Sequence, residues 1–423
     1  MPATAEVPTP GRDHIRIPLS RPEIGEREIE YVTRVLRSGQ LSLGPCLAEF
    51  EESFAAYAGT RYAVAVNSGT SALHLAVKAL GIGPGDEVFT SSFSFVASAN
   101  CLLYEGARPV FVDIHPDTLN LNPAQLWATI KREYTWEPHN RRLVNRLSGR
   151  VAKAILPIHV FGLPCDMAPI VAIAREFNLR ILEDACEAVG AEYCGRRVGT
   201  FGQAGVFAFY PNKQMTTAEG GMLVTNDSEI ARLCRSLRNQ GRDDSDGWLH
   251  HVRLGYNYRL SDLHAALGLA QLDRIEELLA DRARVARAYS ARLAGCPLLS
   301  IPENAPDAKR SWFVYVIQLQ RPSSRPARDR LKAALRARGI ASAAYFPPIH
   351  RQPYFRGYAP MARSFLPHTE AASGKCLSLP FFSAMTDSQV DEVCAAVIEI
   401  LSQIHADYAE VQERPIEVAR SAF

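Results

Sequence analysis

The sequence predicts an α/β protein in which helices cover both faces of a mostly parallel central sheet, with a smaller C-terminal α/β domain after it. Strand-like and helix-like runs alternate through the first half of the chain, which is the rhythm of βαβ units. A long helical segment rich in Ala, Leu and Arg, residues 260–293, then leads to a shorter set of strands and helices. A chain of 423 residues is also too long for one small core.

The alternation is clearest in the N-terminal half. Residues 26–38 have helical spacing, with Ile29, Val32 and Leu36 on one face. Further helix-like runs are 48–57, 72–80, 97–104 and 167–177, and strand-like runs are 62–66, 87–90, 109–112, 152–157 and 180–183. Ligands of such sheets bind beyond the carboxyl ends of the strands, so we expect the site after residues 66 and 183.

The C-terminal half predicts the second domain. Residues 312–319 and 377–380 resemble strands, and residues 329–338 and 387–402 resemble helices. The expected division is a loose arm at 1–15, a large domain at 16–285, a small domain at 286–408 and a tail at 409–423.

Residues 131–150 interrupt the alternation. The segment is basic and polar, and it carries five arginines, Arg132, Arg141, Arg142, Arg146 and Arg150. We interpret it as a solvated surface insertion in the large domain. The alternative is a basic flap over a phosphorylated substrate.

Composition narrows the class of protein. Hydrophobic residues make up 47% of the chain and charged residues 22%, which is ordinary for a soluble globular protein. A net charge of +2 gives no reason to expect nucleic acid or an anionic membrane as partner. Nine scattered cysteines without a Cys-x-x-Cys pair indicate reduced thiols. Without an apolar signal sequence or a membrane-length apolar run, we expect a cytoplasmic protein.

One lysine lies in an unusual frame. The run from Phe209 to Gly221 places Lys213 in a short polar loop between an aromatic strand end and a Glu-Gly-Gly turn. A protein amine in such a loop can hold an aldehyde cofactor as an imine and release it to a substrate amine. Asp184 ends a strand-like run 29 residues upstream, and a carboxylate there can keep a pyridine nitrogen protonated. Taken alone, Asp184 is typical of a helix N-cap, but together with Lys213 it indicates pyridoxal phosphate chemistry.

Two further segments suit that cofactor. The small, hydroxylated run from Asn67 to Ser71 opens a helix, and free N–H groups at a helix start favour a phosphate. An ordinary capped helix has the same appearance. Phe93 and Phe95 follow a strand, and one of them can stack on a pyridine ring, although alternate aromatics are more often core residues.

As a set, these motifs resemble those of the DegT/DnrJ/EryC1/StrS sugar aminotransferases, pyridoxal-phosphate enzymes of the aspartate aminotransferase fold (fold type I). The resemblance covers about residues 17–401. The matching motifs are Asn67-Ser68-Gly69-Thr70, Glu183-Asp184-Ala185, Pro211-Asn212-Lys213, Glu219-Gly220-Gly221 and Gly255-Tyr256-Asn257-Tyr258-Arg259-Leu260-Ser261-Asp262.

The resemblance implies a role for each matching residue. Lys213 would be the Schiff-base lysine and Asp184 the partner of the pyridine nitrogen. Gly69 and Thr70 would bind the cofactor phosphate, and Phe95 rather than Phe93 would stack on the ring.

The Gly-Tyr-Asn-Tyr-Arg segment resembles one that reaches into a neighbouring subunit. Asn257 would then touch the cofactor phosphate there, which implies a homodimer with shared sites. From residue types alone, Asn257 and Arg259 look like a turn before a helix capped by Ser261.

The chain departs from the family pattern at two positions and in the 131–150 insertion, which is longer than usual. Ala208 stands where many relatives have a phosphate-supporting serine, and Glu187 stands where many have Gln or His near the cofactor hydroxyl. A carboxylate there disfavours a phenolate unless it is protonated or turned away. Lys213 itself argues against the branch of the family that has histidine in its place and performs dehydration.

The implied reaction moves an amino group from a donor amino acid, typically glutamate in this family, to a keto-sugar on a nucleotide carrier. Lys213 would carry the proton between the substrate carbon and the cofactor. We name Arg259 and His350 as candidate substrate contacts, with a satisfied surface histidine as the alternative for His350, and we expect His159 to be structural. Alternative functions are an aminotransferase for a cyclic ketone such as an inosose, a related lyase that makes an aromatic amine, and a non-catalytic cofactor-binding regulator.

Overall fold

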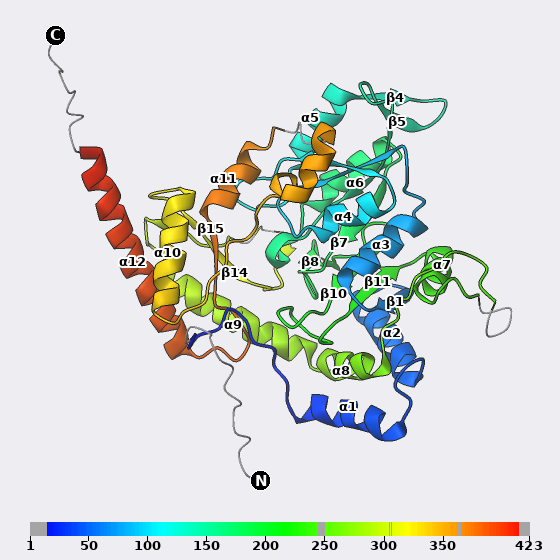
Figure 1. The fold of residues 1–423 in the computed structure, drawn as a ribbon, viewed down its shortest axis with the longest axis horizontal. Coiled ribbons are helices and arrows are strands. Elements are labelled where there is room, and N and C mark those ends of the chain that lie inside the picture. The colour runs from blue at the N-terminus through cyan, green and yellow to red at the C-terminus, as the bar shows by residue number, and fades with distance from the viewer. Residues whose placement is uncertain (1–14, 244–249, 304, 306, 362–364, 414–423) are drawn as a thin grey trace.

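The computed structural model describes residues 15–243, 250–303, 305, 307–361 and 365–413 (Figure 1). Of the arm expected at 1–15, residues 1–14 lie outside the described residues, and so do residues 414–423 of the expected tail.

A nine-stranded sheet forms the centre of the molecule, and its main row has the order β1-β11-β10-β7-β6-β2-β3. Within that row, β11 runs antiparallel to β1 and to β10, and the remaining neighbours pair in parallel. The strands of the row are β1 (Tyr62–Val66), β2 (Asp86–Ser91), β3 (Arg108–Val112), β6 (Val151–Leu156), β7 (Arg180–Asp184), β10 (Ala204–Ala208) and β11 (Gly221–Thr225). The predicted α/β class with a mostly parallel sheet is therefore confirmed.

Helices cover both faces of this sheet. Along β1, Val64 and Val66 pack into one apolar cluster, while Ala63 and Ala65 pack into another, because successive strand side chains point to opposite faces. The helices of this part are α1 (Glu26–Ser38), α2 (Pro45–Ala58), α3 (Gly69–Ala79), α4 (Ala97–Tyr104), α5 (Pro123–Glu133), α6 (Met167–Glu176), α7 (Ser228–Arg238), α8 (Asp262–Leu272) and α9 (Ile275–Leu293).

The helical segment expected at 260–293 is two helices, α8 and α9. They are separated at Asp273 and Arg274, and the Arg274 guanidinium is held there by Glu23 and Glu28. The periodicity is the same in both helices, so the sequence pattern did not reveal the break.

The 131–150 segment is more ordered than a solvated insertion. It forms a hairpin of β4 (Tyr134–Glu137) and β5 (Arg142–Asn145), and β5 pairs antiparallel with β6. Tyr134 and Leu143 are buried, and the Tyr134 hydroxyl donates to Glu87 Oε2 at 2.6 Å. The arginines between these apolar side chains concealed the strand pattern, because they lie on the exposed face.

The C-terminal part has its own three-stranded sheet, in the order β12-β14-β15, and its own apolar cluster. Its elements are β12 (Leu299–Ser300), β14 (Tyr315–Leu319), β15 (Cys376–Leu379), α10 (Arg325–Ala337), α11 (Pro367–Lys375) and α12 (Asp387–Glu413). Figure 1 shows α9 running from α8 toward these elements, and α9 packs on α12. Val285 and Tyr289 of α9 belong to this cluster, and so does Ile17. The division near residue 286 stays a prediction: the C-terminal part has a cluster of its own, but Ile17 and Val285, which were assigned to the large domain, pack in that cluster.

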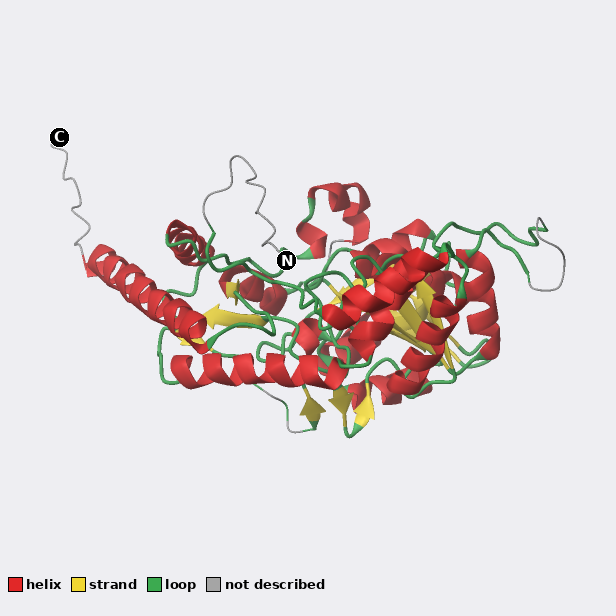
Figure 2. Cartoon of the chain, turned by 90° about the horizontal axis from the view of Figure 1, so that it is seen from below, coloured by secondary structure: helices red, strands yellow, loops and turns green. Residues whose placement is uncertain are grey.

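Helix α12 extends eleven residues beyond the expected end at 402, to Glu413, and Figure 2 shows it reaching away from the rest of the molecule. Residues 403–413 contain neither Gly nor Pro, so nothing in this stretch breaks the helix, and the first proline after it is Pro415.

Smaller elements are the sheet β13-β8-β9 (Ala308–Lys309, Glu192–Tyr193 and Arg196–Arg197) and the 3-10 turns η1 (Val160–Gly162), η2 (Ile349–Arg351) and η3 (Pro353–Met361). Across the described ranges, no helix combines the length and the apolar character that a membrane crossing requires.

Candidate active site

Lys213 lies in the loop between β10 and β11. Its backbone N–H donates to the Tyr210 carbonyl at 2.9 Å, and its side chain is 13% exposed. The Lys213 Nζ atom lies 3.9 Å from the centre of the Phe313 ring and 3.8 Å from Glu187 Oε1. The amine is therefore held between an aromatic face and a carboxyl group.

Asp184 is the last residue of β7, at the carboxyl end of the parallel strands. Its Oδ2 atom accepts a hydrogen bond from Ser98 Oγ at 2.7 Å, and its Oδ1 atom accepts one from the Cys186 backbone N–H at 3.1 Å. Both donors fix the orientation of a buried carboxylate. Ser98 was not predicted, because its contact with Asp184 depends on how α4 packs against β7.

The start of α3 faces the same strand ends. Ser68 caps this helix, with its Oγ accepting from the Ser71 N–H at 3.1 Å. A Cβ atom on Gly69 would lie 2.7 Å from the Ala208 Cβ and 3.1 Å from the Cys186 sulfur, so only glycine fits there. Ala208, one of the two departures from the family pattern, is thus packed directly against the helix start.

These elements surround one cavity of about 780 Å³. Six of the predicted residues line it: Gly69, Thr70, Phe95, Asp184, Glu187 and Lys213. Phe93 is instead fully buried against Phe161 and Phe346. Of residues 131–150, all of which the structure describes, none lines the cavity.

Several other lining residues had no individual role assigned to them from the sequence, although Tyr345 and Phe346 belong to a loop whose sequence resembles the one that lines the sugar entrance in the family. Phe313, Tyr345 and Phe346 belong to the C-terminal part and form an aromatic wall. Asn212 also lines the cavity, and its Oδ1 atom is buried without a hydrogen-bond partner among the described residues. Phe313 is distant in sequence from every motif of the site, so only the fold reveals its place at the cavity.

Glu187 is a buried acid of the cavity whose pKa is raised. Its Oε2 atom accepts a hydrogen bond from the Phe161 N–H at 2.8 Å, and its Oε1 atom faces Lys213. Burial raises the pKa of Glu187, and the charge of Asp184 raises it further, against the opposing effects of Lys213 and the Phe161 N–H. The neutral acid is therefore favoured at Glu187 more than at an ordinary glutamate.

Three predicted residues do not line this cavity. Asn257 is exposed, and Arg259 donates to Asn239 Oδ1 at 3.1 Å. The His350 ring lies 2.7 Å from Ser92 Oγ and 3.2 Å from Glu370 Oε1, and burial lowers its pKa. Its nitrogen atoms are thus engaged away from the cavity, which does not favour His350 as a substrate contact.

His159 is fully buried and lies outside the cavity lining. Its Nε2 is 3.2 Å from Glu183 Oε2, and its Nδ1 accepts from the Cys165 N–H at 3.0 Å. This arrangement agrees with the structural role expected for it.

The donor set fits pyridoxal 5′-phosphate. One cavity presents the amine of Lys213, the carboxylate of Asp184 with its two hydrogen-bond donors, and the start of α3, where only glycine fits at position 69. It also presents an exposed aromatic ring, that of Phe95. The unpartnered Asn212 Oδ1 atom shows that the cavity also offers a polar group for a ligand. Fold and site together define the class of pyridoxal-phosphate-dependent aminotransferases.

Comparison with known proteins identifies the family. Residues 22–398 match the model of the DegT/DnrJ/EryC1/StrS aminotransferase family, and the chain belongs to that family. It is 39% identical to the GDP-perosamine synthase of Caulobacter vibrioides over 91% of this chain and 98% of that protein. It is 38% identical to the spore coat polysaccharide biosynthesis protein SpsC of Bacillus subtilis, over 92% of this chain and 98% of that protein.

Solved structures agree with this membership. The structure of S. venezuelae DesV, in complex with a ketimine intermediate, superposes with a TM-score of 0.80 at 35% identity, covering 91% of this chain and 98% of that one. An aminotransferase of the same family from Brucella abortus gives a TM-score of 0.78 at 34% identity, covering 90% and 95%. The chain is thus an enzyme, and its relatives are sugar aminotransferases.

Proposed function

We propose that this enzyme transfers the amino group of L-glutamate to a nucleotide-linked keto-sugar, for the synthesis of amino sugars used in polysaccharides or antibiotics. The observation that carries the proposal is the placement of Lys213 and Asp184 on one cavity, with Glu187 beside the amine. The two curated relatives, named for perosamine and for spore coat polysaccharide, support a sugar acceptor.

Pyridoxal 5′-phosphate, when bound, supplies an aldehyde that condenses with amines and a ring that accepts the electrons of a substrate carbanion. In this chain, Asp184 would keep the pyridine nitrogen protonated, because its carboxylate is buried and oriented by Ser98 and Cys186. The N–H groups at the start of α3 and the Thr70 hydroxyl would hold the phosphate. Phe95 would stack on the ring.

Lys213 would act twice. Its amine would hold the cofactor, and, once a donor amine has taken its place, it would serve as the base and acid that moves a proton at the substrate carbon. Glu187 would hold a proton beside this amine, because burial favours its neutral form. A neutral acid donates a hydrogen bond to a phenolate, so the departure from Gln or His is compatible with the chemistry.

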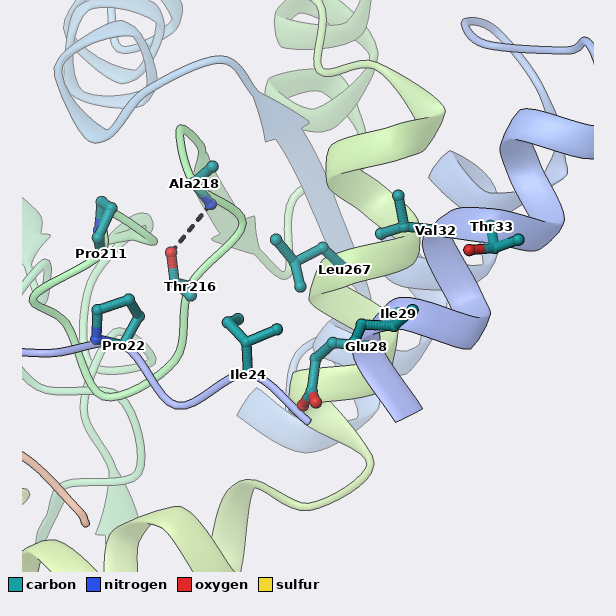
Figure 3. Close-up of a pocket in the computed structure, with 10 residues that line it drawn as sticks. All are labelled: Pro22, Ile24, Glu28, Ile29, Val32, Thr33, Pro211, Thr216, Ala218 and Leu267. Atoms are coloured by element: carbon teal, nitrogen blue, oxygen red, sulfur yellow. Dashed lines mark hydrogen bonds between the residues drawn. The ribbon is translucent and has the colours of Figure 1, made fainter. Parts of the chain in front are cut away.

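We also propose that the enzyme is a homodimer. An apolar groove of about 390 Å³ lies beside the lysine loop, and Figure 3 shows the residues that line it, among them Ile24, Ile29 and Val32 from the α1 region and Thr216 and Ala218 from the loop. Ile24 and Ile29 are about half exposed in the single chain, and Asn257 is exposed too. A second copy that covers this groove would contact the reverse side of the loop that carries Lys213, and it would present its Asn257 to the neighbouring site. We propose separately that the enzyme is located in the cytoplasm.

The test follows the two halves of the reaction. Protein loaded with pyridoxal 5′-phosphate should absorb near the edge of the visible range, lose that band with glutamate, and regain it with a nucleotide keto-sugar. Lys213→Ala should lack the band, while Lys309→Ala, which changes an exposed lysine paired with Glu192, should keep it. If glutamate removes the band and an inosose rather than any keto-sugar restores it, the acceptor is a cyclic ketone. An unaltered band in Lys213→Ala would refute the role of the lysine.

A further inference from the structure

A buried arginine holds the backbone of the lysine loop. Arg282 is on α9 and is 2% exposed. Its Nη2 donates to the Lys213 carbonyl at 2.7 Å, and its Nη1 donates to the Phe313 carbonyl at 3.1 Å and to the Trp312 carbonyl at 3.5 Å. One guanidinium therefore joins the lysine loop to the segment that enters β14.

This arginine is unusual because its charge is not neutralised by contact with an acid. Within the described ranges it makes no ion pair, and its Nε atom is buried without a hydrogen-bond partner. Burial lowers the pKa of Arg282 to about 10, and the charge of Glu23 opposes that effect. A buried charge is costly unless its contacts compensate. The compensating groups are the carbonyls of Lys213 and Phe313, together with the Phe381 ring, whose centre lies 5.7 Å from the guanidinium carbon.

The two carbonyls belong to residues that already meet at the amine. The Lys213 Nζ atom lies over the Phe313 ring, so the fork of Arg282 fixes the backbone of both members of this contact. A second set of hydrogen bonds also connects the lysine loop to the segment before β14. In it, Gln214 Nε2 donates to Ser311 Oγ at 3.0 Å and to the Glu187 carbonyl at 2.6 Å. Arg282 on α9 therefore couples the position of the amine to that of the Phe313 ring, and Gln214 connects the lysine loop to Glu187.

We propose that Arg282 is a positioning residue for Lys213, and that its two-carbonyl fork sets where the amine stands relative to Phe313 and Glu187. Lysine cannot replace it, since an ammonium group lacks the planar fork that reaches two acceptors at once. Glu187 and Cys186 interact electrostatically with the amine, and Asp184 and Glu219 line the same cavity. Among the described residues, Arg282 makes no hydrogen bond or ion pair with any of these four groups. This inference rests on the proposed role of Lys213.

The experiment compares Arg282→Lys, which keeps the charge, with Arg282→Met, which keeps only the apolar stem. In both variants, kcat should fall about 10- to 100-fold with KM within about twofold, because the amine loses its alignment while substrate binding persists. In both, the pH midpoint of the absorption band of the cofactor should move in the loaded enzyme. In cofactor-free protein, the rate at which trinitrobenzenesulfonate labels Lys213, measured by peptide mass, should change as well.

The matched control is Arg328→Met on α10. Arg328 is 5% exposed and donates to the Ser373 carbonyl at 2.9 Å, so its loss should reduce stability without moving either lysine readout. If Arg282→Met does not fold, Arg282→Lys decides the question. The inference would be overturned if Arg282→Lys kept the wild-type pH midpoint of the absorption band and the wild-type labelling rate of Lys213. It would also be overturned if Arg328→Met shifted these two readouts as much as the Arg282 variants do. A wild-type enzyme whose band does not depend on Lys213 would instead overturn the proposed function.

Discussion

The two parts of the chain contribute different chemistry to the cavity. Every charged residue that lines it, Asp184, Glu187, Lys213 and Glu219, comes from the part built on the large sheet. From residue 313 onward the lining is aromatic, apolar or amide in character, as with Phe313 and Tyr345. In the proposed mechanism, the large sheet supplies the groups that hold or move protons, and the C-terminal part supplies the surface against which these groups are placed.

This difference explains why the site needs both parts. A lysine amine is flexible and strongly hydrated, and it reacts at one place only when its surroundings hold it there. Glu187 and the Phe313 ring flank the Lys213 amine from different parts of the chain. Substitutions on the sheet side should therefore affect chemistry most, and substitutions on the aromatic side should affect alignment.

The largest effect in this comparison is expected at Asp184. Asp184→Asn keeps the shape but removes the charge that would hold the pyridine nitrogen protonated, so kcat should fall about 100-fold or more. Ser98→Ala should cost less, since the Cys186 N–H still orients the carboxylate. Steady-state kinetics of both variants measure the ranking, and an Asp184→Asn enzyme with wild-type kcat would contradict the assignment.

A smaller effect is expected on the aromatic side. Phe313→Leu keeps a large apolar group but removes the ring face below Lys213 Nζ, so kcat should fall about 10-fold, which corresponds to a cation–π contact of about 1–2 kcal/mol. Phe355→Leu is the control, because Phe355 is fully buried and lies outside the cavity. Equal kinetic losses in both variants would show that general packing, and not the ring below the amine, is responsible.

Glu187 predicts a dependence of stability on pH. Its pKa is raised in the folded protein, so its contribution is fully present below its ordinary value of 4.5 and is lost as pH rises through the folded value. Glu187→Gln imitates the neutral acid, so the stability of the variant relative to wild type should increase with pH above about 4.5, by at most about 1.4 kcal/mol per unit.

Thermal unfolding of cofactor-free protein between pH 4 and pH 8, a range of about four units, measures that difference. The control is Glu276→Gln, which changes an exposed glutamate paired with Arg197. A difference that stays constant or narrows as the pH rises would show that Glu187 is charged in the folded protein.

The smallest effect is expected at the β4–β5 hairpin. Arg132, Arg141 and Arg146 are exposed, and no residue of the hairpin lines the cavity. Changing all three to Gln should leave kcat/KM for a nucleotide keto-sugar within about twofold. A drop of about 10-fold or more in kcat/KM would favour the alternative of a basic flap over a phosphorylated substrate.

The parts of the site that were predictable from sequence are those carried by local motifs. Lys213, Asp184 and Gly69 lie at strand ends or helix starts, and a βαβ rhythm brings such positions to one edge of a sheet. The fold class followed from the same rhythm, and it is confirmed. These predictions needed only the order of elements, because parallel strands place their carboxyl ends together.

The unpredicted parts depend on packing between distant segments. Phe313 and Arg282 meet Lys213 only because α9 and the start of β14 lie beside the lysine loop, and no local signal marks either residue. His350 shows the opposite case: the sequence predicts a candidate substrate contact, but the ring of His350 is turned toward Ser92 and Glu370. Hairpin β4–β5 was missed because the exposed Arg141 and Arg142 directly precede the buried Leu143 and hide the strand pattern.

The most direct test of the central claim is to locate the covalent bond between the cofactor and the protein. Enzyme loaded with pyridoxal 5′-phosphate is reduced with borohydride and digested, and the peptides are sequenced by mass spectrometry. The account predicts the added cofactor mass on Lys213, and its loss from this peptide in Lys213→Ala. Attachment to another lysine in the wild-type enzyme, or no attachment at all, would contradict it.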